Sequence, residues 1–294
     1  MDYKNLFSLK DKVIVVTGGT GVLGKAFIEG IAAFGGKVVI IGRNETEGNK
    51  RADEINKNGG TAIFAKGNVL DVKDMEKVRD VVLEKFGRID GLLNGAGGNM
   101  PQGVIQPDQD VFEMNLEGLQ QVLDLNLMGT IIPTKVFGSV IAKQGGGSIV
   151  NISSVSSKES ITKVLGYSLG KAGVDCFTRW MAVEVSKRHG DKVRVNGIMP
   201  GFFLTEQNRT LLTNPDGSLT ERGNLVIKKS PGGRMGKPEE LVGALIYLLS
   251  DASVFVNGTD IYVDGGLVAF SGIDRKSTRL NSSHEWISRM PSSA

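Results

Sequence analysis

Residues 12–24 read Lys-Val-Ile-Val-Val-Thr-Gly-Gly-Thr-Gly-Val-Leu-Gly, and the fold follows from this stretch. Its first part, residues 12–16, is rich in β-branched side chains and predicts a strand, whereas residues 25–34 repeat apolar side chains with the period of a helix. The glycines permit a tight turn, and the start of a helix offers free N–H groups to a pyrophosphate. The order strand, glycine turn, helix therefore predicts a nucleotide site, with an ordinary glycine-rich loop as the alternative. The residues expected to contact the nucleotide at this turn are Gly18, Thr20, Val22 and Leu23.

Strand-like and helix-like segments alternate through the rest of the chain. Further strands are expected at 37–41, 62–65, 89–93, 148–152, 193–198 and 259–263, and helices at 47–58, 73–86, 116–144 and 239–249, with one more ending near residue 188. This alternation predicts an α/β fold, a single-domain Rossmann-type doubly wound parallel sheet with helices on both faces. We expect residues 1–273 to form that domain, with the polar, turn-rich segment 202–231 as an irregular lid. Residues 274–294 are rich in serine and lack core periodicity, so we expect a disordered tail foreign to the fold.

The composition argues against several classes of function. The net charge is +3 and basic residues are scattered among acids, so no block favours nucleic acid or a membrane surface. We find no run of eighteen apolar residues and no apolar signal segment. The single cysteine, Cys176, cannot form an internal disulfide, which fits a reducing, cytoplasmic setting. With only two histidines, His189 and His284, no histidine-based triad or metal cluster can be built.

Three strand ends carry residues suited to a dinucleotide. Arg43 lies about twenty residues past the glycine turn, where it could pair with a ribose 2′-phosphate, which favours NADP over NAD. Asn68 and Val69 could border the adenine. The fourth strand ends in Asn-Gly-Ala-Gly, from which Asn94, Ala96 and Gly97 are expected contacts. A solvent-facing arginine and a simple loop are the alternatives.

Tyr167 and Lys171 stand one helical turn apart, so their side chains share a helix face. A free tyrosine has a pKa near ~10, and a nearby ammonium favours the phenolate and lowers that pKa. The pair could therefore exchange a proton with a substrate near neutral pH. The alternative is a tyrosine and a lysine that merely share a face.

Taken with the glycine turn and with Asn126, Ser154, Pro200 and Gly201, this pair resembles the short-chain dehydrogenase/reductase family, over about residues 8–273. The resemblance implies an NAD(P)-dependent enzyme, commonly a tetramer, without a metal. It implies that Tyr167 is the general acid or base and that Lys171 lowers the Tyr167 pKa and holds the nicotinamide ribose. It also implies that Ser154 orients the substrate oxygen, that Asn126 anchors a water relay, and that Pro200, Gly201 and Thr205 lie at the nicotinamide. The chain departs from the family pattern in carrying its glycine at Gly21 instead of at position 22, Gly95 within Asn-Gly-Ala-Gly, and Asn68 in place of the common aspartate.

The chain is further similar to a subgroup of D-mannonate oxidoreductases, which reduce D-fructuronate. The likeness is carried by residues 94–99 and by the run from Pro200 to Arg222. It implies a small sugar-acid substrate, with a gluconate 5-dehydrogenase-like enzyme and a 3-oxoacyl-carrier reductase as alternatives. A non-catalytic dinucleotide-binding module is the alternative from another class.

A carboxylate entering a partly dry pocket needs a cation, and the planar fork of arginine suits it best. Arg209 is the first candidate in the expected lid and Arg222 the second, while Asn99 and Ser154 could bind substrate oxygens. The alternative is that both arginines face solvent or join subunits.

Overall fold

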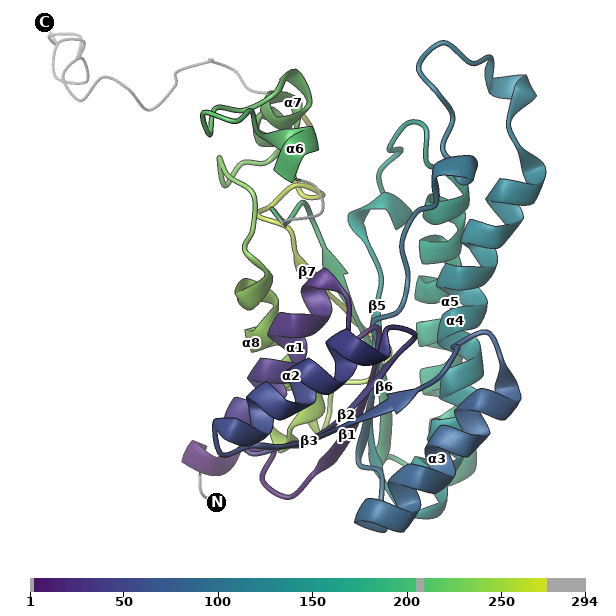
Figure 1. The fold of residues 1–294 in the computed structure, drawn as a ribbon, viewed down its shortest axis with the longest axis vertical. Coiled ribbons are helices and arrows are strands. Elements are labelled where there is room, and N and C mark those ends of the chain that lie inside the picture. Colours follow the sequence, from purple (N-terminus) through teal and green to yellow (C-terminus); the bar gives the residue numbers. More distant parts are fainter. Residues whose placement is uncertain (1–2, 205–208, 274–294) are drawn as a thin grey trace, which may run out of the picture.

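The first strand, β1 (Val13–Thr17), has five buried residues, because its sheet is covered on both faces. The computed structural model describes residues 3–204 and 209–273. They form a seven-stranded parallel sheet of order β3-β2-β1-β4-β5-β6-β7 (Figure 1). The strand order reverses between β1 and β4, which is where doubly wound sheets bind ligands. The other strands are β2 (Lys37–Gly42), β3 (Thr61–Lys66), β4 (Gly91–Asn94), β5 (Gly147–Ile152), β6 (Val193–Pro200) and β7 (Asp260–Val263).

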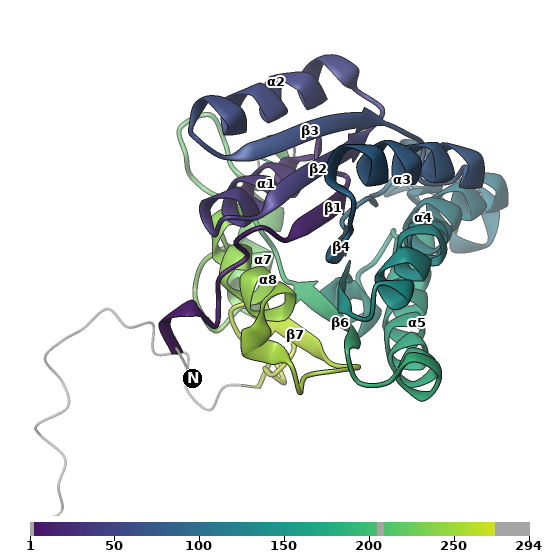
Figure 2. The ribbon, with the colours of Figure 1, turned by 90° about the horizontal axis from the view of Figure 1, so that it is seen from below.

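Two sets of helices cover the two faces of the sheet. On one face lie α1 (Val22–Ala33), α2 (Glu45–Lys57) and α8 (Val242–Leu249), and on the other α3 (Val72–Phe86), α4 (Leu116–Lys143) and α5 (Leu165–His189) (Figure 2). Each set contributes the apolar side of its helices to one of two buried clusters, which meet β1 from opposite sides. The predicted fold class and all seven predicted strands are confirmed, with ends displaced by at most two residues.

Polar side chains fix where several helices begin. Asn44 accepts from the Glu47 N–H at the start of α2, and Asp71 accepts from two N–H groups at the start of α3. Asn115 and Thr220 cap α4 and α7 (Glu221–Lys229) in the same way. These caps satisfy N–H groups that the helices themselves leave free.

The prediction that 202–231 is irregular was wrong, because this segment contains α6 (Arg209–Leu212) and α7 (Glu221–Lys229). Thr220 caps α7, and Val226 buries its side chain in a small apolar cluster with Leu212 and Met235. The turn-rich sequence before residue 220 did not indicate α7, because this helix depends on packing against a tertiary cluster.

One helix of the described chain, α4, is long and apolar enough by composition to cross a membrane. Half of that apolar window is buried, and Val136, Phe137 and Ile141 belong to the cluster on the α3–α5 face of the sheet. It is a core helix of the fold. The tail expected at 274–294 lies outside the described residues.

Candidate active site

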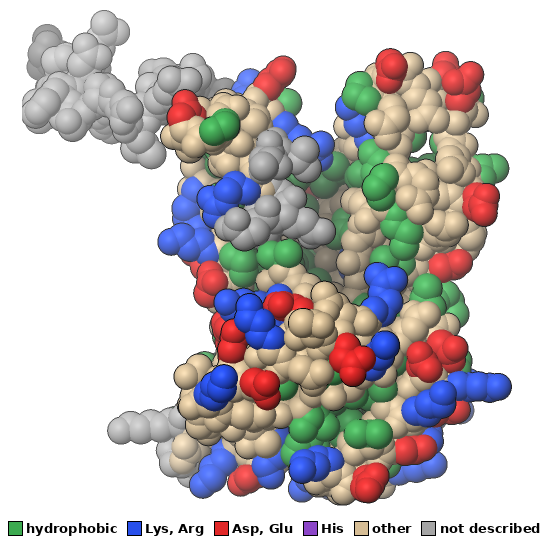
Figure 3. All heavy atoms as spheres, in the orientation of Figure 1, with side chains coloured by type: hydrophobic (Ala, Val, Ile, Leu, Met, Phe, Trp, Pro, Cys, Tyr) green, Lys and Arg blue, Asp and Glu red, His purple; other side chains and the backbone are tan. Residues whose placement is uncertain are grey.

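A cleft of about 540 Å³ opens at the carboxyl ends of the central strands. Its walls include Gly18 after β1, Gly95 after β4, Ser153 after β5 and Gly201 after β6. Figure 3 shows the molecule hollowed between the α6–α7 segment and the α4–α5 side. The cleft therefore lies at the place where the strand order reverses.

The glycine turn closely approaches the loop after β4. Gly18 has a φ of +68°, and a Cβ at this position would lie 2.6 Å from the Gly95 carbonyl oxygen. The Thr17 hydroxyl accepts from the N–H groups of Gly95 and Ala96 at 3.1 and 3.2 Å, which fixes the two loops together. At the N-cap of α1, Gly21 offers no side-chain cap. The first N–H groups of α1 thus face the cleft beside Val22 and Leu23, and this cradle fits a dinucleotide pyrophosphate.

Arg51 is a residue that the sequence analysis missed. From α2 its guanidinium donates to the carbonyl oxygens of Gly19 and Gly21, each at 2.7 Å, and to Glu47 at 2.6 Å. These bonds brace the glycine turn from behind. The Glu47–Arg51 spacing of four residues was the available signal, but it normally indicates only a surface ion pair.

The expected adenosine contacts lie at the edge of this region and do not line the cleft. Arg43 and Asn68 are exposed, and Val69 is buried in the core. Thr20 packs against Gly42, where a Cβ would lie 2.5 Å from the Thr20 hydroxyl oxygen. Gly42 therefore makes room for the turn.

The three predicted contacts after β4, namely Asn94, Ala96 and Gly97, differ in whether they bond within the fold or line the cleft. The Asn94 amide is buried and donates to Thr134 and Asn151, both at 2.8 Å, so its side chain is used within the fold. The backbone of Ala96 is held by Thr17, whereas Gly97 lines the cleft.

Four predicted catalytic residues converge behind Gly97. A Cβ at Gly97 would lie 2.6 Å from Asn126 Oδ1 and 3.2 Å from Lys171 Nζ. Lys171 Nζ donates to the Ile152 carbonyl at 2.7 Å and lies 5.6 Å from the centre of the Tyr167 ring. The Ser154 hydroxyl bonds to Tyr167 and accepts from the Ser156 N–H.

Asn126 is fully buried in α4, and both polar atoms of its side-chain amide are hydrogen-bonded. Its Oδ1 accepts from the Gly98 N–H at 3.0 Å, and its Nδ2 donates to the carbonyls of Gly98 and Val122. The predicted need for partners in an apolar stretch is thereby met. Asn126 ties α4 to the loop after β4, beside Lys171.

The expected effect of Lys171 on Tyr167 is not what this geometry gives. Burial raises the pKa of the Tyr167 phenol, and the hydrogen bond from Ser154 offsets only part of that rise. Burial also lowers the pKa of Lys171 to about 8, against a neighbouring Asp175 that raises it. Both residues are therefore biased towards their neutral forms.

The predicted substrate residues separate into two groups. Both arginines are exposed, but Arg222 lines the cleft, as do Asn99, Pro200, Gly201 and Ser154, whereas Arg209 does not. Arg222, the second candidate, is thus the arginine that lies at the cleft. Thr205 lies outside the described residues.

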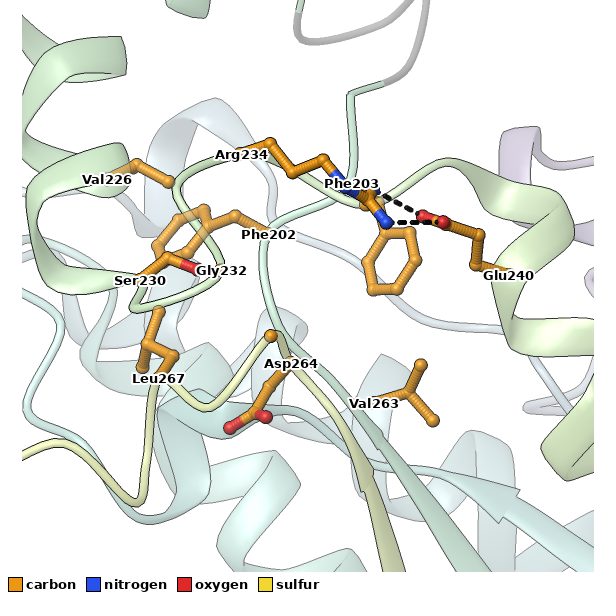
Figure 4. A pocket seen from close by; sticks show the side chains of 12 residues that line it. Phe202, Phe203, Val226, Ser230, Gly232, Arg234, Glu240, Val263, Asp264 and Leu267 are labelled. Atoms are coloured by element: carbon orange, nitrogen blue, oxygen red, sulfur yellow. Dashed lines mark hydrogen bonds and ion pairs between the residues drawn. The ribbon is translucent and has the colours of Figure 1, made fainter. Parts of the chain in front are cut away.

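A second cavity of about 230 Å³ lies beside the cleft and shares Phe202 and Phe203 with it. Figure 4 shows Val226 and Leu267 near Phe202, and Arg234 joined to Glu240. That ion pair has two bonds, of 2.6 and 2.7 Å. Phe202 and Phe203 therefore lie between the cleft and this second cavity.

The sheet, the braced glycine turn and the Ser–Tyr–Lys cluster define a dinucleotide-dependent oxidoreductase of the α/β class. The comparisons agree. A family model described as enoyl-(acyl carrier protein) reductase matches residues 21–268. The oxidoreductase UxuB of Bacillus subtilis, itself uncharacterized, is 40% identical over 90% of this chain and 98% of its own. The chain belongs to the short-chain dehydrogenase/reductase family and is NAD(P)-dependent.

Two solved structures show the same fold. A protein of Haemophilus influenzae, provisionally assigned as a D-mannonate oxidoreductase and solved with NAD, is 37% identical, with a TM-score of 0.83 and coverage of 90% of this chain and 98% of its own. A gluconate 5-dehydrogenase of Burkholderia cenocepacia, in complex with NADP and tartrate, is 30% identical, with a TM-score of 0.79 and coverage of 90% and 98%.

Proposed function

We propose that this enzyme interconverts a keto sugar acid of the D-fructuronate type and its hydroxy acid. The observation that carries the proposal is the convergence of Asn126, Ser154, Tyr167 and Lys171 on a cleft that Arg222 and Asn99 also line. When bound, the nicotinamide supplies or accepts the hydride. The chain must then supply the proton, orient the carbonyl and hold the carboxylate.

In the reductive direction the Tyr167 hydroxyl gives its proton to the substrate oxygen. Burial keeps this phenol protonated, which suits a general acid, and Ser154 donates a hydrogen bond that orients the same oxygen. Lys171 steadies the charge that develops on the phenol and holds the nicotinamide ribose. Asn126 fixes the loop at Gly98 and so keeps Lys171 in place. Asn126 is also the proposed anchor of the water relay.

The substrate class is supported by the cation at the cleft. Arg222 lies on α7, within the segment that we propose closes over the substrate, and its position at the cleft supports the proposal that it binds the carboxylate. The likeness to a provisional mannonate oxidoreductase and to a gluconate dehydrogenase supports a sugar acid. A gluconate 5-dehydrogenase-like activity is the second candidate, favoured by that last relative.

The test is oxidation of NADH and NADPH followed by absorbance, with D-fructuronate, 5-keto-D-gluconate and an acetoacetyl thioester as substrates. We expect the keto sugar acids to be reduced and the thioester to be a poor substrate. Tyr167→Phe is the control for turnover at this site. Reduction of the thioester alone would contradict the sugar-acid assignment, and cofactor binding without turnover of any substrate would favour a binding module.

We further propose that the enzyme assembles as a homotetramer. Apolar side chains on one stripe of α5 stay exposed, namely Leu165, Leu169, Trp180 and Val183. Neighbours in this set are four, eleven and three residues apart. Each spacing is close to a whole number of helical turns, so the four side chains lie along a single helix face, which a second copy could cover. Sedimentation equilibrium measures the assembly, and Trp180→Glu should weaken it.

A further inference from the structure

A buried carboxylate lies one helical turn past Lys171. Asp175 on α5 has a side chain that is 2% exposed, and it is not part of the proton transfer described above. A buried carboxylate is costly unless it is paired. Its partners therefore indicate what it does.

Asp175 holds both sides of the Ser154 turn. The Ser153 hydroxyl donates to Asp175 Oδ1, and Lys158 Nζ lies 3.1 Å from Asp175 Oδ2. Ser153 directly precedes Ser154, and Lys158 ends the short 3₁₀ turn (Val155–Ser157) that Ser154 caps. A single carboxylate thus ties the start and the end of this turn to the helix that carries Tyr167 and Lys171.

A second carboxylate makes the arrangement more costly. Asp260 on β7 packs against Gly197, where any Cβ would overlap Asp260 Oδ1, and Arg179 lies 3.8 Å from its other oxygen. Within the described chain, Asp260 Oδ1 has no hydrogen-bond partner. Repulsion from Asp175 contributes to a raised pKa of Asp260, after burial. Stability alone does not favour two buried acids side by side.

We propose that Asp175 is a positioning residue of the hydride-transfer site, which holds the Ser154 turn against α5 and presents a negative charge to Lys171. The proposal rests on the proposed function of this site. The charged groups that face Asp175 are Lys171 on α5, Lys158 after the 3₁₀ turn and Asp260 on β7, and Asp260 in turn faces Arg179. Burial lowers the pKa of Lys171 to about 8, and the charge of Asp175 opposes that shift and so favours the ammonium form of Lys171.

The test compares Asp175→Asn with wild type from pH 6 to pH 10. Two readouts are needed: kcat for the substrate that wild type reduces, and the Kd for NADH measured by its fluorescence. Asparagine can still accept from Ser153 but removes the charge. We expect the loss of kcat and of NADH affinity at alkaline pH to begin about one pH unit lower, the scale on which a neighbouring charge shifts a pKa. Asp260→Asn is the matched control, because Asp260 is a buried acid without a contact to Ser153. In this variant kcat and NADH affinity should fall at the same alkaline pH as in wild type.

Curves for Asp175→Asn that superimpose on wild type in both readouts would overturn the proposal. If wild type reduces no substrate of the panel, the proposed function fails, and the NADH curves alone then decide the role of Asp175. If Asp175→Asn does not fold, Ser153→Ala tests the positioning contact. It should lower kcat by about 10- to 150-fold, the range for one hydrogen bond to a charged group, and leave the alkaline fall in kcat in place. An unchanged kcat for Ser153→Ala would contradict the proposal.

Discussion

Lys171 is buried and yet must carry its charge to steady the Tyr167 phenolate. Burial lowers its pKa to about 8, so the ammonium form is lost as pH rises through that value. We therefore expect reductive activity to fall through about pH 8. Lys171→Met should lose most of the rate, and its residual rate should lack this limb. A wild-type profile that is flat from pH 7 to pH 10 would contradict the role given to Lys171.

Tyr167 tests the proton transfer more directly. Tyr167→Phe removes only the hydroxyl that bonds to Ser154, so the chain should fold and bind NADH as wild type does. Turnover should fall by roughly 10²–10⁴-fold, the usual contribution of a general acid. Single-turnover measurements with saturating NADH separate this loss from any change in binding. A rate close to that of wild type would exclude Tyr167 as the proton donor.

Two arginines near the glycine turn should affect cofactor binding differently. Arg43 is exposed after β2, whereas Arg51 bonds to two carbonyls of the turn itself. Arg43→Ala should weaken NADPH binding and leave NADH binding nearly unchanged. Arg51→Met should weaken both, because the turn that holds the pyrophosphate loses its brace. Calorimetric titration of each variant with each nucleotide measures the four affinities, and equal losses of both nucleotides in Arg43→Ala would make that residue structural.

At the scale of elements, α7 brings Arg222 to the cleft. The Thr220 cap and the burial of Val226 hold this helix in place, and Phe202 lies between the cleft and the neighbouring cavity. An element anchored by so small a cluster can shift at modest cost, as a lid requires.

Arg222→Met should therefore lose kcat/KM for a keto sugar acid but not for the uncharged keto-polyol analogue. The loss expected is ~1.5–3 kcal/mol, the range for hydrogen bonds to charged groups. Arg209→Met is the control from the same segment, since Arg209 is exposed like Arg222 but does not line the cleft. Equal losses for both substrates would place the carboxylate anchor elsewhere.

At the scale of the whole molecule, the order of strands and helices could be predicted because each element carries its own periodicity. Tyr167 and Lys171 could be paired because they share one helix turn. Arg51 and Asp175 could not be found in this way, since their partners, Gly19, Gly21 and Ser153, come from other elements. The direction of the Tyr167 pKa shift was missed for a related reason: it depends on burial, which no local pattern reports.

The free energy of unfolding of the whole chain should depend on pH through the protonation of Asp260. Burial raises the pKa of its carboxyl to about 6, so the folded chain holds this proton more tightly than the unfolded chain does. Its stabilising contribution is present below the ordinary pKa of 3.8 and is lost as pH rises through about 6. Asp260→Asn should therefore raise the free energy of unfolding at pH 8, by at most ~3 kcal/mol from the linkage of one pKa unit to 1.36 kcal/mol. The partly exposed ion pair with Arg179 offsets little of this gain. Urea unfolding of both proteins at pH 8, 6.5 and 5 measures the difference, which should shrink as pH falls. A difference that stays constant, or grows towards pH 5, would show that Asp260 is ionised in the folded chain at every pH tested.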